Sequence, residues 1–380
     1  ISDFSGRMNK LGTASFSGSQ IGFSTGFLYV DDGWAEILGT RDTDGSIILW
    51  GDQRVTVDRN APFTGLKAYN TGNYVSGAAR FSNPLTLRGV GTDLSVELYG
   101  TLNNNIVLNN GWVYLRNDLV FADDYSMTGS GICYLQDRTV TFGADDLSFL
   151  YTLSWVGDGA VEINSDITMT GTWVFIGEST LRGNGNRIIL DPDGALIVWH
   201  NSTAKFENVI IEGLAQSAQS AGTYNLRCLD SDSKIILRDT KLILDQDYSF
   251  TKGTIDVERS ANFLGDGKTF NYTSDLDFTI KNDSKLTFDP GFKFSYTSLA
   301  GTNDHFVMQD ATSELFLDGC TLHATDVGLR LETGKVTVKD KVALESDATI
   351  QADAVEFDSA MEVKILSGAT LDVKGILVYD

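Results

Sequence analysis

Gly194-Ala195-Leu196-Ile197-Val198-Trp199 is the stretch that decides the fold, because it is one copy of a recurring phrase. A small residue is followed by a short run in which apolar residues dominate, and then by a polar turn. From about residue 95 onward the phrase returns roughly every 20 to 40 residues, as irregular repeats of a solenoid do. Further copies occupy residues 234–238, 254–257, 285–288, 314–317, 335–338 and 370–373.

The periodicity of the chain favours strands over helices. No apolar pattern at i, i+3, i+4 and i+7 persists beyond about two turns, whereas short alternating runs such as Val161-Glu162-Ile163 end at Gly, Asn, Asp or Ser. Asn110-Gly111, Asp158-Gly159 and Asp193-Gly194 are hairpin-type dipeptides. However, the strands come in unequal twos and threes, which favours pairing with the next coil over pairing across a turn. We therefore expect an all-β fold, a right-handed parallel β-helix (β-solenoid) with aliphatic ladders inside.

The first part of the chain is less regular than the rest. Residues 1–90 are rich in Gly, Ser and Thr, and the repeating phrase is harder to find there. We predict an irregular β segment over residues 1–90, acting as a cap, a head or early coils, and a parallel β-helix over residues 91–380.

Composition narrows the range of partners. The formal net charge is −22, and 42% of the 380 residues are hydrophobic. An acidic surface repels phosphate backbones and anionic membranes, so nucleic acid is not expected as a partner. No run approaches the roughly 20 apolar residues that a membrane-spanning helix needs, so no membrane span is expected.

The cysteines and the first residue bear on localisation. Cys133, Cys228 and Cys320 are far apart, form no CxxC pair and are odd in number, so we expect small buried side chains and not disulfides. The sequence begins at Ile1, which is compatible with removal of a leader and with secretion. We expect an extracellular or cell-surface protein.

Three stretches resemble right-handed parallel β-helix proteins of the pectin-lyase-like type, which include bacterial surface passengers, adhesins and phage tailspikes. They are residues 194–198, 201–211 and Ser367-Gly-Ala-Thr-Leu-Asp-Val-Lys-Gly375. The resemblance covers roughly three quarters of the chain and concerns the fold. The polygalacturonase branch carries Asn-Thr-Asp, Gly-Asp-Asp, Gly-His-Gly and Arg-Ile-Lys, and none of these occurs here. That difference counts against glycosidase activity.

Paired carboxylates are the recurrent feature that resembles catalysis. Residues at i and i+2 of a strand share a face, and two carboxylates about 6–7 Å apart are near the spacing used in glycoside hydrolysis. Asp191 and Asp193 are the best pair, because the Gly-rich residues 183–187 precede them. The competing interpretation is structural, since Asp-Pro-Asp-Gly is a turn sequence.

Asp-rich bends could also bind Ca²⁺, which takes several oxygen ligands at one point. The weak candidates are Asp42, Asp44, Asp158, Asp191 and Asp193. None matches an EF-hand loop or a nonapeptide Ca²⁺ repeat. The sequence therefore predicts no cofactor, with Ca²⁺ as the open alternative.

The histidines and tryptophans do not indicate a catalytic or metal site. His200 follows an apolar run at a turn and is expected to be a rim residue without a role; no HExxH or HxH pair indicates zinc. Trp112, Trp155, Trp173 and Trp199 lie in apolar runs, so we expect them to pack in the core or at the edge of a coil.

These observations favour a non-enzymatic structural or adhesive protein that forms a homo-oligomer or homopolymer, as a filament or a surface layer. The last strand-like run, residues 376–379, supports the expectation of pairing between copies. A glycan or a host surface is a further expected partner. The alternative is a carbohydrate-active enzyme, a polysaccharide hydrolase or lyase, or a tailspike-like glycan binder, with Asp191 and Asp193 in a groove.

Overall fold

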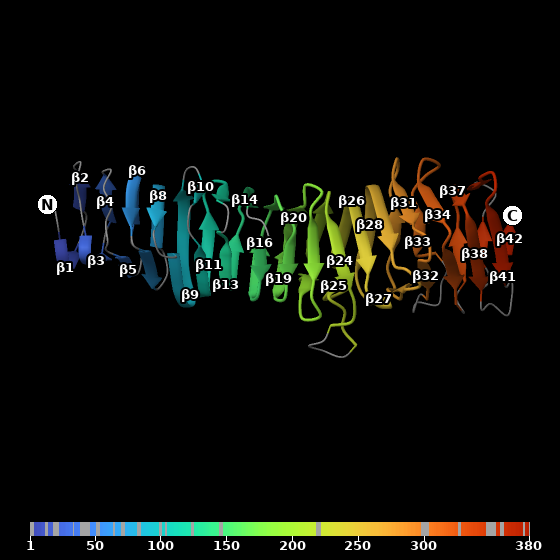
Figure 1. The fold of residues 1–380 in the computed structure, drawn as a ribbon, viewed down its shortest axis with the longest axis horizontal. Coiled ribbons are helices and arrows are strands. Elements are labelled where there is room, and N and C mark those ends of the chain that lie inside the picture. The colour runs from blue at the N-terminus through green and yellow to red at the C-terminus, as the bar shows by residue number, and fades with distance from the viewer. Residues whose placement is uncertain are drawn as a thin grey trace. The chain divides into compact units, whose positions relative to one another are not determined.

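The structure is a computed structural model (Figure 1). It describes the strands between residues 4 and 102 as backbone, and the chain with its side chains from residue 105 onward, with gaps. The residues left out of the description are 1–3, 12–13, 18–22, 33, 39–45, 51–53, 64, 70–72, 82–84, 99–100, 103–104, 123–124, 144–146, 218–221, 298–303, 326–327, 347–354, 358–360, 375–376 and 380.

All regular elements of the described residues are β-strands, and they fall into two compact units, residues 1–167 and 168–380. The first unit holds β1 (Phe4–Leu11), β2 (Ala14–Ser17), β3 (Phe23–Asp32), β4 (Trp34–Leu38), β5 (Ser46–Trp50), β6 (Arg54–Phe63), β7 (Gly65–Tyr69), β8 (Asn73–Phe81), β9 (Leu85–Leu98), β10 (Thr101–Leu102), β11 (Ile106–Leu115), β12 (Leu119–Phe121), β13 (Met127–Tyr134), β14 (Arg138–Phe142), β15 (Leu147–Phe149), β16 (Thr152–Val156) and β17 (Gly159–Ile163). β18 (Ile167–Met169) lies at the boundary.

The second unit continues the same pattern of short strands. It holds β19 (Thr172–Ile176), β20 (Glu178–Arg182), β21 (Arg187–Leu190), β22 (Ala195–Val198), β23 (Thr203–Glu207), β24 (Ile210–Leu214), β25 (Leu226–Cys228), β26 (Lys234–Leu244), β27 (Tyr248–Phe250), β28 (Thr254–Leu264), β29 (Thr269–Tyr272), β30 (Phe278–Ile280), β31 (Lys285–Phe288), β32 (Lys293–Tyr296), β33 (Phe306–Met308), β34 (Glu314–Asp318), β35 (Thr321–Ala324), β36 (Leu329–Leu331), β37 (Gly334–Lys339), β38 (Lys341–Ser346), β39 (Val355–Phe357), β40 (Met361–Ile365), β41 (Thr370–Lys374) and β42 (Leu377–Tyr379).

Strands of the first unit pair in parallel with the equivalent strand of the next coil. One ladder runs β1-β3-β5-β7-β9-β11-β13-β16, and a second runs β2-β4-β6-β8-β9. The strands between residues 4 and 98 therefore belong to parallel ladders as well. β9 runs through residue 90, and the separate role predicted for residues 1–90 stays a prediction.

The second unit is built on the same principle. Its ladders are β19-β22-β25, β21-β24-β26-β28-β31-β34-β37-β40, β27-β29-β32-β35-β38-β41 and β36-β39-β42. Register partners are 20 residues apart between Ile235 and Ile255 and 31 apart between Ala204 and Ile235. The predicted parallel β-solenoid is confirmed, with coils of unequal length.

The hairpin-type dipeptides form no hairpins. Asn110-Gly111 lies inside β11, where the register shifts, and Asn110 adopts a left-handed φ of 58°. Asn208 and Asp239 adopt similar values, 49° and 52°. These residue types tolerate the left-handed region better than others do. Asn110 and Asp239 therefore accommodate register shifts inside β11 and β26, and Asn208 forms the bend between β23 and β24.

The interior is filled by in-register ladders, and between β27 and β33 several of these ladders are aromatic. The predicted aliphatic ladders exist elsewhere, as in the buried partners Ile188 and Ile211. Phe250 and Tyr272 stack with ring centroids 5.7 Å apart, and Tyr272 and Tyr296 follow at 6.3 Å. Strand spacing of about 4.8 Å places rings within the range of offset stacking, which adds to the burial of apolar area.

Buried hydroxyl side chains satisfy backbone groups where the coils bend. Ser313 donates to the carbonyl of Ile280 at 3.0 Å, and Thr240 to that of Phe206 at 2.8 Å. An unpaired buried carbonyl would cost about 1–3 kcal/mol. These short polar side chains therefore replace the strand hydrogen bonds that the bends interrupt.

Phe263 offers a test of the aromatic interior. Its side chain is 0% exposed and packs against Phe270, Phe278, Phe288 and Phe292. We expect Phe263→Ala to lower the free energy of unfolding by about 3–5 kcal/mol, because the cavity removes contacts to two neighbouring coils. Urea denaturation followed by circular dichroism measures it.

Phe316→Ala is the matched control. Phe316 lies on the outer face of β34, where the ammonium of Lys285 sits 3.9 Å from its ring centroid, so its loss should cost only about 1 kcal/mol. Equal destabilisation by the two variants would contradict an aromatic core centred on Phe263.

Candidate functional site

Asp191 and Asp193 lie in a β-turn between β21 and β22. The Gly194 N–H donates to the Asp191 carbonyl at 2.8 Å, and the Asp191 N–H donates to the Met169 carbonyl of the coil before at 3.0 Å. The backbone geometry is that of the turn interpretation, because residues i and i+3 are joined. A catalytic role for the two carboxylates stays a prediction.

The remaining calcium candidates are distributed along the chain. Asp158 lies in an exposed bend before β17, where its carbonyl accepts the Asp137 N–H at 2.5 Å. Asp42 and Asp44 lie outside the described residues. Within the described residues, no group of three or more His, Cys, Asp or Glu side chains is placed to hold a metal ion.

His200 belongs to a polar corner that the register of the coils assembles. Its Nδ1 lies 2.8 Å from Oδ2 of Asp230, thirty residues further along the chain. Ser233 donates to Oδ1 of the same carboxylate, and the Asn201 N–H approaches that oxygen at 3.4 Å. The exposed His200 is thus fixed by a carboxylate from the next coil, which the sequence interpretation of a rim residue without a role did not include.

Trp199 completes this corner. Its side chain is 43% exposed, and its ring lies edge-on to the ring of His200, with centroids 5.1 Å apart. Trp155 and Trp173 are fully buried, as expected, but Trp199 follows the end of β22 at the bend and turns outward. The corner presents an aromatic face beside an imidazole and a carboxylate.

The corner has the residue types of a Ser-His-Asp triad but not its order of contacts. A triad needs the hydroxyl on the imidazole, whereas the Ser233 hydroxyl contacts the Asp230 carboxylate and the Trp199 carbonyl. The hydrogen bond from Ser233 is the largest reason why the pKa of Asp230 is lowered, with smaller contributions from His200 and Asn201. This arrangement positions the imidazole and does not activate a nucleophile.

A second polar group lies on the outer face of the same unit and alternates in charge from coil to coil. Arg182, Glu207, Arg238 and Glu258 are successive register partners. Glu207 lies 3.5 Å from Arg182, 3.5 Å from Arg238 and 3.7 Å from Arg259. A hollow of about 480 Å³ beside it is lined by Arg182, Asn184, Glu207, Asn208, Asp239 and Arg259.

A further ladder of alternating charge follows in later coils. Glu314 lies 3.8 Å from Lys285 and 3.6 Å from Lys335, and Thr337 donates to it at 2.7 Å. Burial raises the pKa of Glu314, but the hydrogen bond from Thr337 and the two ammonium groups outweigh burial and lower it.

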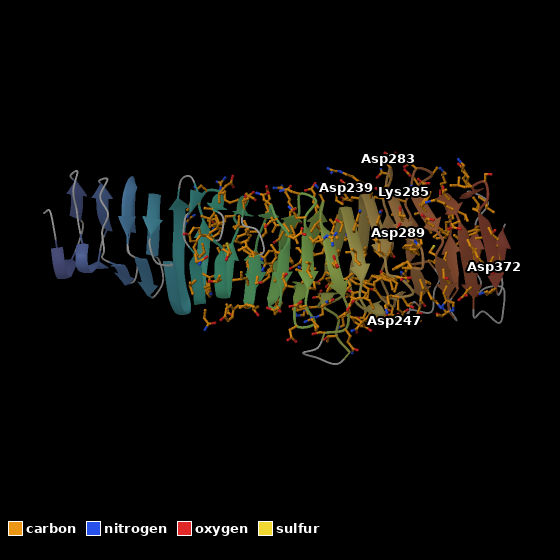
Figure 2. The ribbon with its side chains drawn as sticks, in the orientation of Figure 1. Asp239, Asp247, Asp283, Lys285, Asp289 and Asp372 are labelled. Carbon is orange, nitrogen blue, oxygen red and sulfur yellow. The ribbon has the colours of Figure 1, made fainter. Side chains whose placement is uncertain are left out.

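Figure 2 shows Asp239 and Asp283 at one edge of the second unit and Asp247 at the opposite edge.

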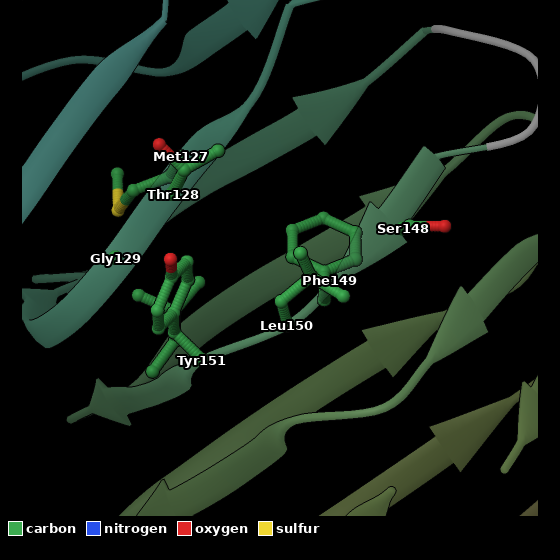
Figure 3. A pocket seen from close by; sticks show the side chains of 8 residues that line it. Met127, Thr128, Gly129, Ser148, Phe149, Leu150 and Tyr151 are labelled. Atoms are coloured by element: carbon green, nitrogen blue, oxygen red, sulfur yellow. The ribbon is translucent and has the colours of Figure 1, made fainter.

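The first unit carries a small apolar hollow of about 50 Å³. It is lined by Met127, Thr128, Gly129, Ser148, Phe149, Leu150, Tyr151 and Leu153 (Figure 3). Leu150 and Tyr151, in the bend between β15 and β16, are 61% and 54% exposed. Large apolar side chains exposed side by side are a feature of contact surfaces.

Comparisons of the chain with protein-family models, with curated proteins and with solved structures gave no match. In the part of the chain that the structure describes, we found no helix with the length and hydropathy needed to cross a membrane.

The Asp230 corner gives a prediction about pH. We expect the carboxyl of Asp230 to titrate below its ordinary value of 3.8. Because its pKa is lower in the folded state, its contribution to stability is present above pH 3.8 and is lost as the pH falls through the folded pKa. Carbon-detected NMR of the side-chain carboxyl measures the midpoint.

Ser233→Ala should move this midpoint upward, since it removes the strongest hydrogen bond to the carboxylate. Ser249→Ala, which removes a hydroxyl that contacts Tyr224 instead, should leave the midpoint unchanged. A midpoint at or above 3.8 in the unmodified protein would show that the corner does not stabilise the ionised carboxylate.

Proposed function

We propose that this chain is a non-enzymatic structural β-solenoid of an extracellular or cell-surface protein. The observation that carries the proposal is that side chains form ladders across successive coils on both faces of the sheet. Inward side chains form apolar ladders, and outward side chains form ladders of alternating charge, as at Arg182, Glu207 and Arg238. Side chains on both faces of the sheet thus hold neighbouring coils together. Such a construction suits a stiff scaffold that displays its bends.

The three cysteines are protected from oxidation by burial. Cys133, Cys228 and Cys320 are buried and unpaired, and burial raises the pKa of Cys228 and that of Cys320 to about 12. Thiols react as thiolates, so protonated and buried thiols resist oxidation. Buried, unpaired cysteines occur in both oxidising and reducing compartments, so they leave the redox compartment open.

Self-association is the more specific form of the proposal. The bend with Leu150 and Tyr151 offers apolar area beside a small hollow, and a second copy of the chain presents the same bend. A symmetric dimer uses one patch twice. The net charge of −22 opposes such contacts, so association should strengthen with salt, which screens repulsion.

We expect the purified chain to associate reversibly and the double variant Leu150→Ser, Tyr151→Ser to remain monomeric, because it removes the exposed apolar area. Light scattering over a range of protein and salt concentrations measures this. Thr152→Ser, at the start of β16 directly after the bend, leaves the apolar side chains in place and is the control. A chain that is monomeric under all conditions contradicts the self-associating form.

Glycan binding is the second candidate function, and the exposed Trp199 beside His200 and Asp230 is the observation that favours it. Sugar rings present C–H groups that pack on exposed aromatic faces, while imidazole and carboxylate groups hydrogen-bond to hydroxyls. A hydrolase or lyase acting through Asp191 and Asp193 is the enzymatic form of this alternative.

A screen of acidic and neutral polysaccharides separates the scaffold from both forms of the alternative. The scaffold predicts no cleavage and no retention that depends on Trp199. Retention lost in Trp199→Ala but kept in Trp112→Ala would establish glycan binding at the corner. Cleavage lost in Asp191→Asn and Asp193→Asn would establish the enzyme and overturn the proposed function.

A further inference from the structure

The ladder of strands is interrupted between β25 and β27. β25 is the last strand of the ladder β19-β22-β25, whereas β27 is the first strand of the ladder that continues to β29. On either side, each coil donates backbone hydrogen bonds to the coil before, as Thr273 does to Phe250 at 2.9 Å. No strand pairing joins β25 to β27 among the described residues. We call this interruption the seam.

Side chains bridge the seam in place of backbone hydrogen bonds. The phenol of Tyr248 donates to the carbonyl of Leu226, and the phenol of Tyr224 donates to the hydroxyl of Ser249 at 3.1 Å. The buried Asn225 joins the two ends of the connection between β24 and β25. Its side-chain amide donates to the Gly213 carbonyl at 2.7 Å and accepts the Ala215 N–H at 3.0 Å. The seam is therefore a fixed feature of the fold.

A pocket of about 260 Å³ opens at the seam. Its cationic side chains are Arg227 and Lys252, its aliphatic hydroxyl groups are those of Thr223, Ser249 and Thr251, and Tyr224 adds a phenol. Among the described residues that line it, none is Asp or Glu. In a chain with 51 acidic and 29 basic residues, two cations without a carboxylate form a local exception to the charge of the protein. The volume suits a small ligand.

Arg227 differs from the other arginines of the second unit. The other five, Arg182, Arg187, Arg238, Arg259 and Arg330, each pair with a carboxylate. Arg227 instead donates from Nη1 to the Tyr224 carbonyl at 2.6 Å, and it forms no ion pair with any described residue. Burial lowers its pKa, because the charged guanidinium has lost part of its hydration. A half-buried guanidinium normally has an anionic partner.

The nearest acidic residue along the chain does not supply that partner. Asp230 follows Leu229, a lining residue, but its carboxylate oxygens are engaged by Ser233, His200 and the Asn201 N–H. A planar guanidinium has five N–H donors in a fork that matches a carboxylate, and one of them is used by the Tyr224 carbonyl. Donors therefore remain for an anion.

We infer that the seam pocket binds a small hydroxylated organic carboxylate, with Arg227 as the direct contact of its carboxylate group. Lys252 is exposed at the same pocket and attracts the anion through charge. The hydroxyls of Thr223, Ser249 and Thr251 suit hydrogen bonds to the hydroxyls of the ligand. A sulfate ester offers similar oxygen acceptors, so the experiment compares the two anions. The inference does not depend on the proposed scaffold function.

Isothermal titration calorimetry on the full chain tests this site with three probes: glucuronate, glucose 6-sulfate and glucose. We expect saturable binding of glucuronate, weaker binding of the sulfate and no binding of glucose. Arg227→Gln should weaken glucuronate binding by at least about tenfold, because a charge-assisted hydrogen bond is lost. Lys252→Gln should weaken it by roughly two- to fivefold and flatten its salt dependence.

Arg182→Gln is the matched control, since it removes one positive charge from an ion pair elsewhere in the same unit. It should leave binding within about twofold, consistent with screening of distant charges. Melting curves check the fold of each variant, and Lys252→Gln alone decides the outcome if Arg227→Gln does not fold. The inference is overturned if no probe binds, if glucose binds as well as glucuronate, if the sulfate binds more tightly, or if the pocket variants behave like the control.

Discussion

Hydrogen bonding between the backbones of successive coils is the constraint on which this structure depends. Except at the seam between β25 and β27, successive coils pair their equivalent strands in parallel, so residues at one register position form a ladder across the coils. A ladder with apolar side chains fills the interior, and a ladder with alternating charges holds the exterior. A coil alone buries too little apolar area to be stable, so each coil depends on its neighbours.

The same register assembles polar groups that are distant in the sequence. Asp230 reaches His200 because their bends lie in successive coils, and Glu207 lies among three arginines for the same reason. Exposed ion pairs contribute little to stability individually. Their repetition at fixed register nevertheless opposes slippage of one coil against the next, since a shift would bring like charges together.

At the seam between β25 and β27, the ladder of paired strands is interrupted. Two phenols take over the role of backbone hydrogen bonds, and the space that a continuous ladder would fill becomes a pocket with Arg227 and Lys252. Elsewhere in the second unit, outward arginines form ion pairs with carboxylates. The half-buried guanidinium of Arg227 at the seam has no carboxylate partner among the described residues, and this distinguishes the seam from the regular coils.

The sequence by itself determined the all-β class and the parallel stacking, because alternating apolar residues and Asn, Asp or Gly bends are local signals. It also indicated that the cysteines are buried. The tertiary structure alone decided which side chains meet, because register partners are 20 residues apart at Ile235 and Ile255 but 31 apart at Ala204 and Ile235. Coils of unequal length give no constant offset, so neither the His200–Asp230 pair nor the isolation of Arg227 could be read from spacing. Asp191 and Asp193 show the converse: a strand-like spacing of two residues occurs within a turn.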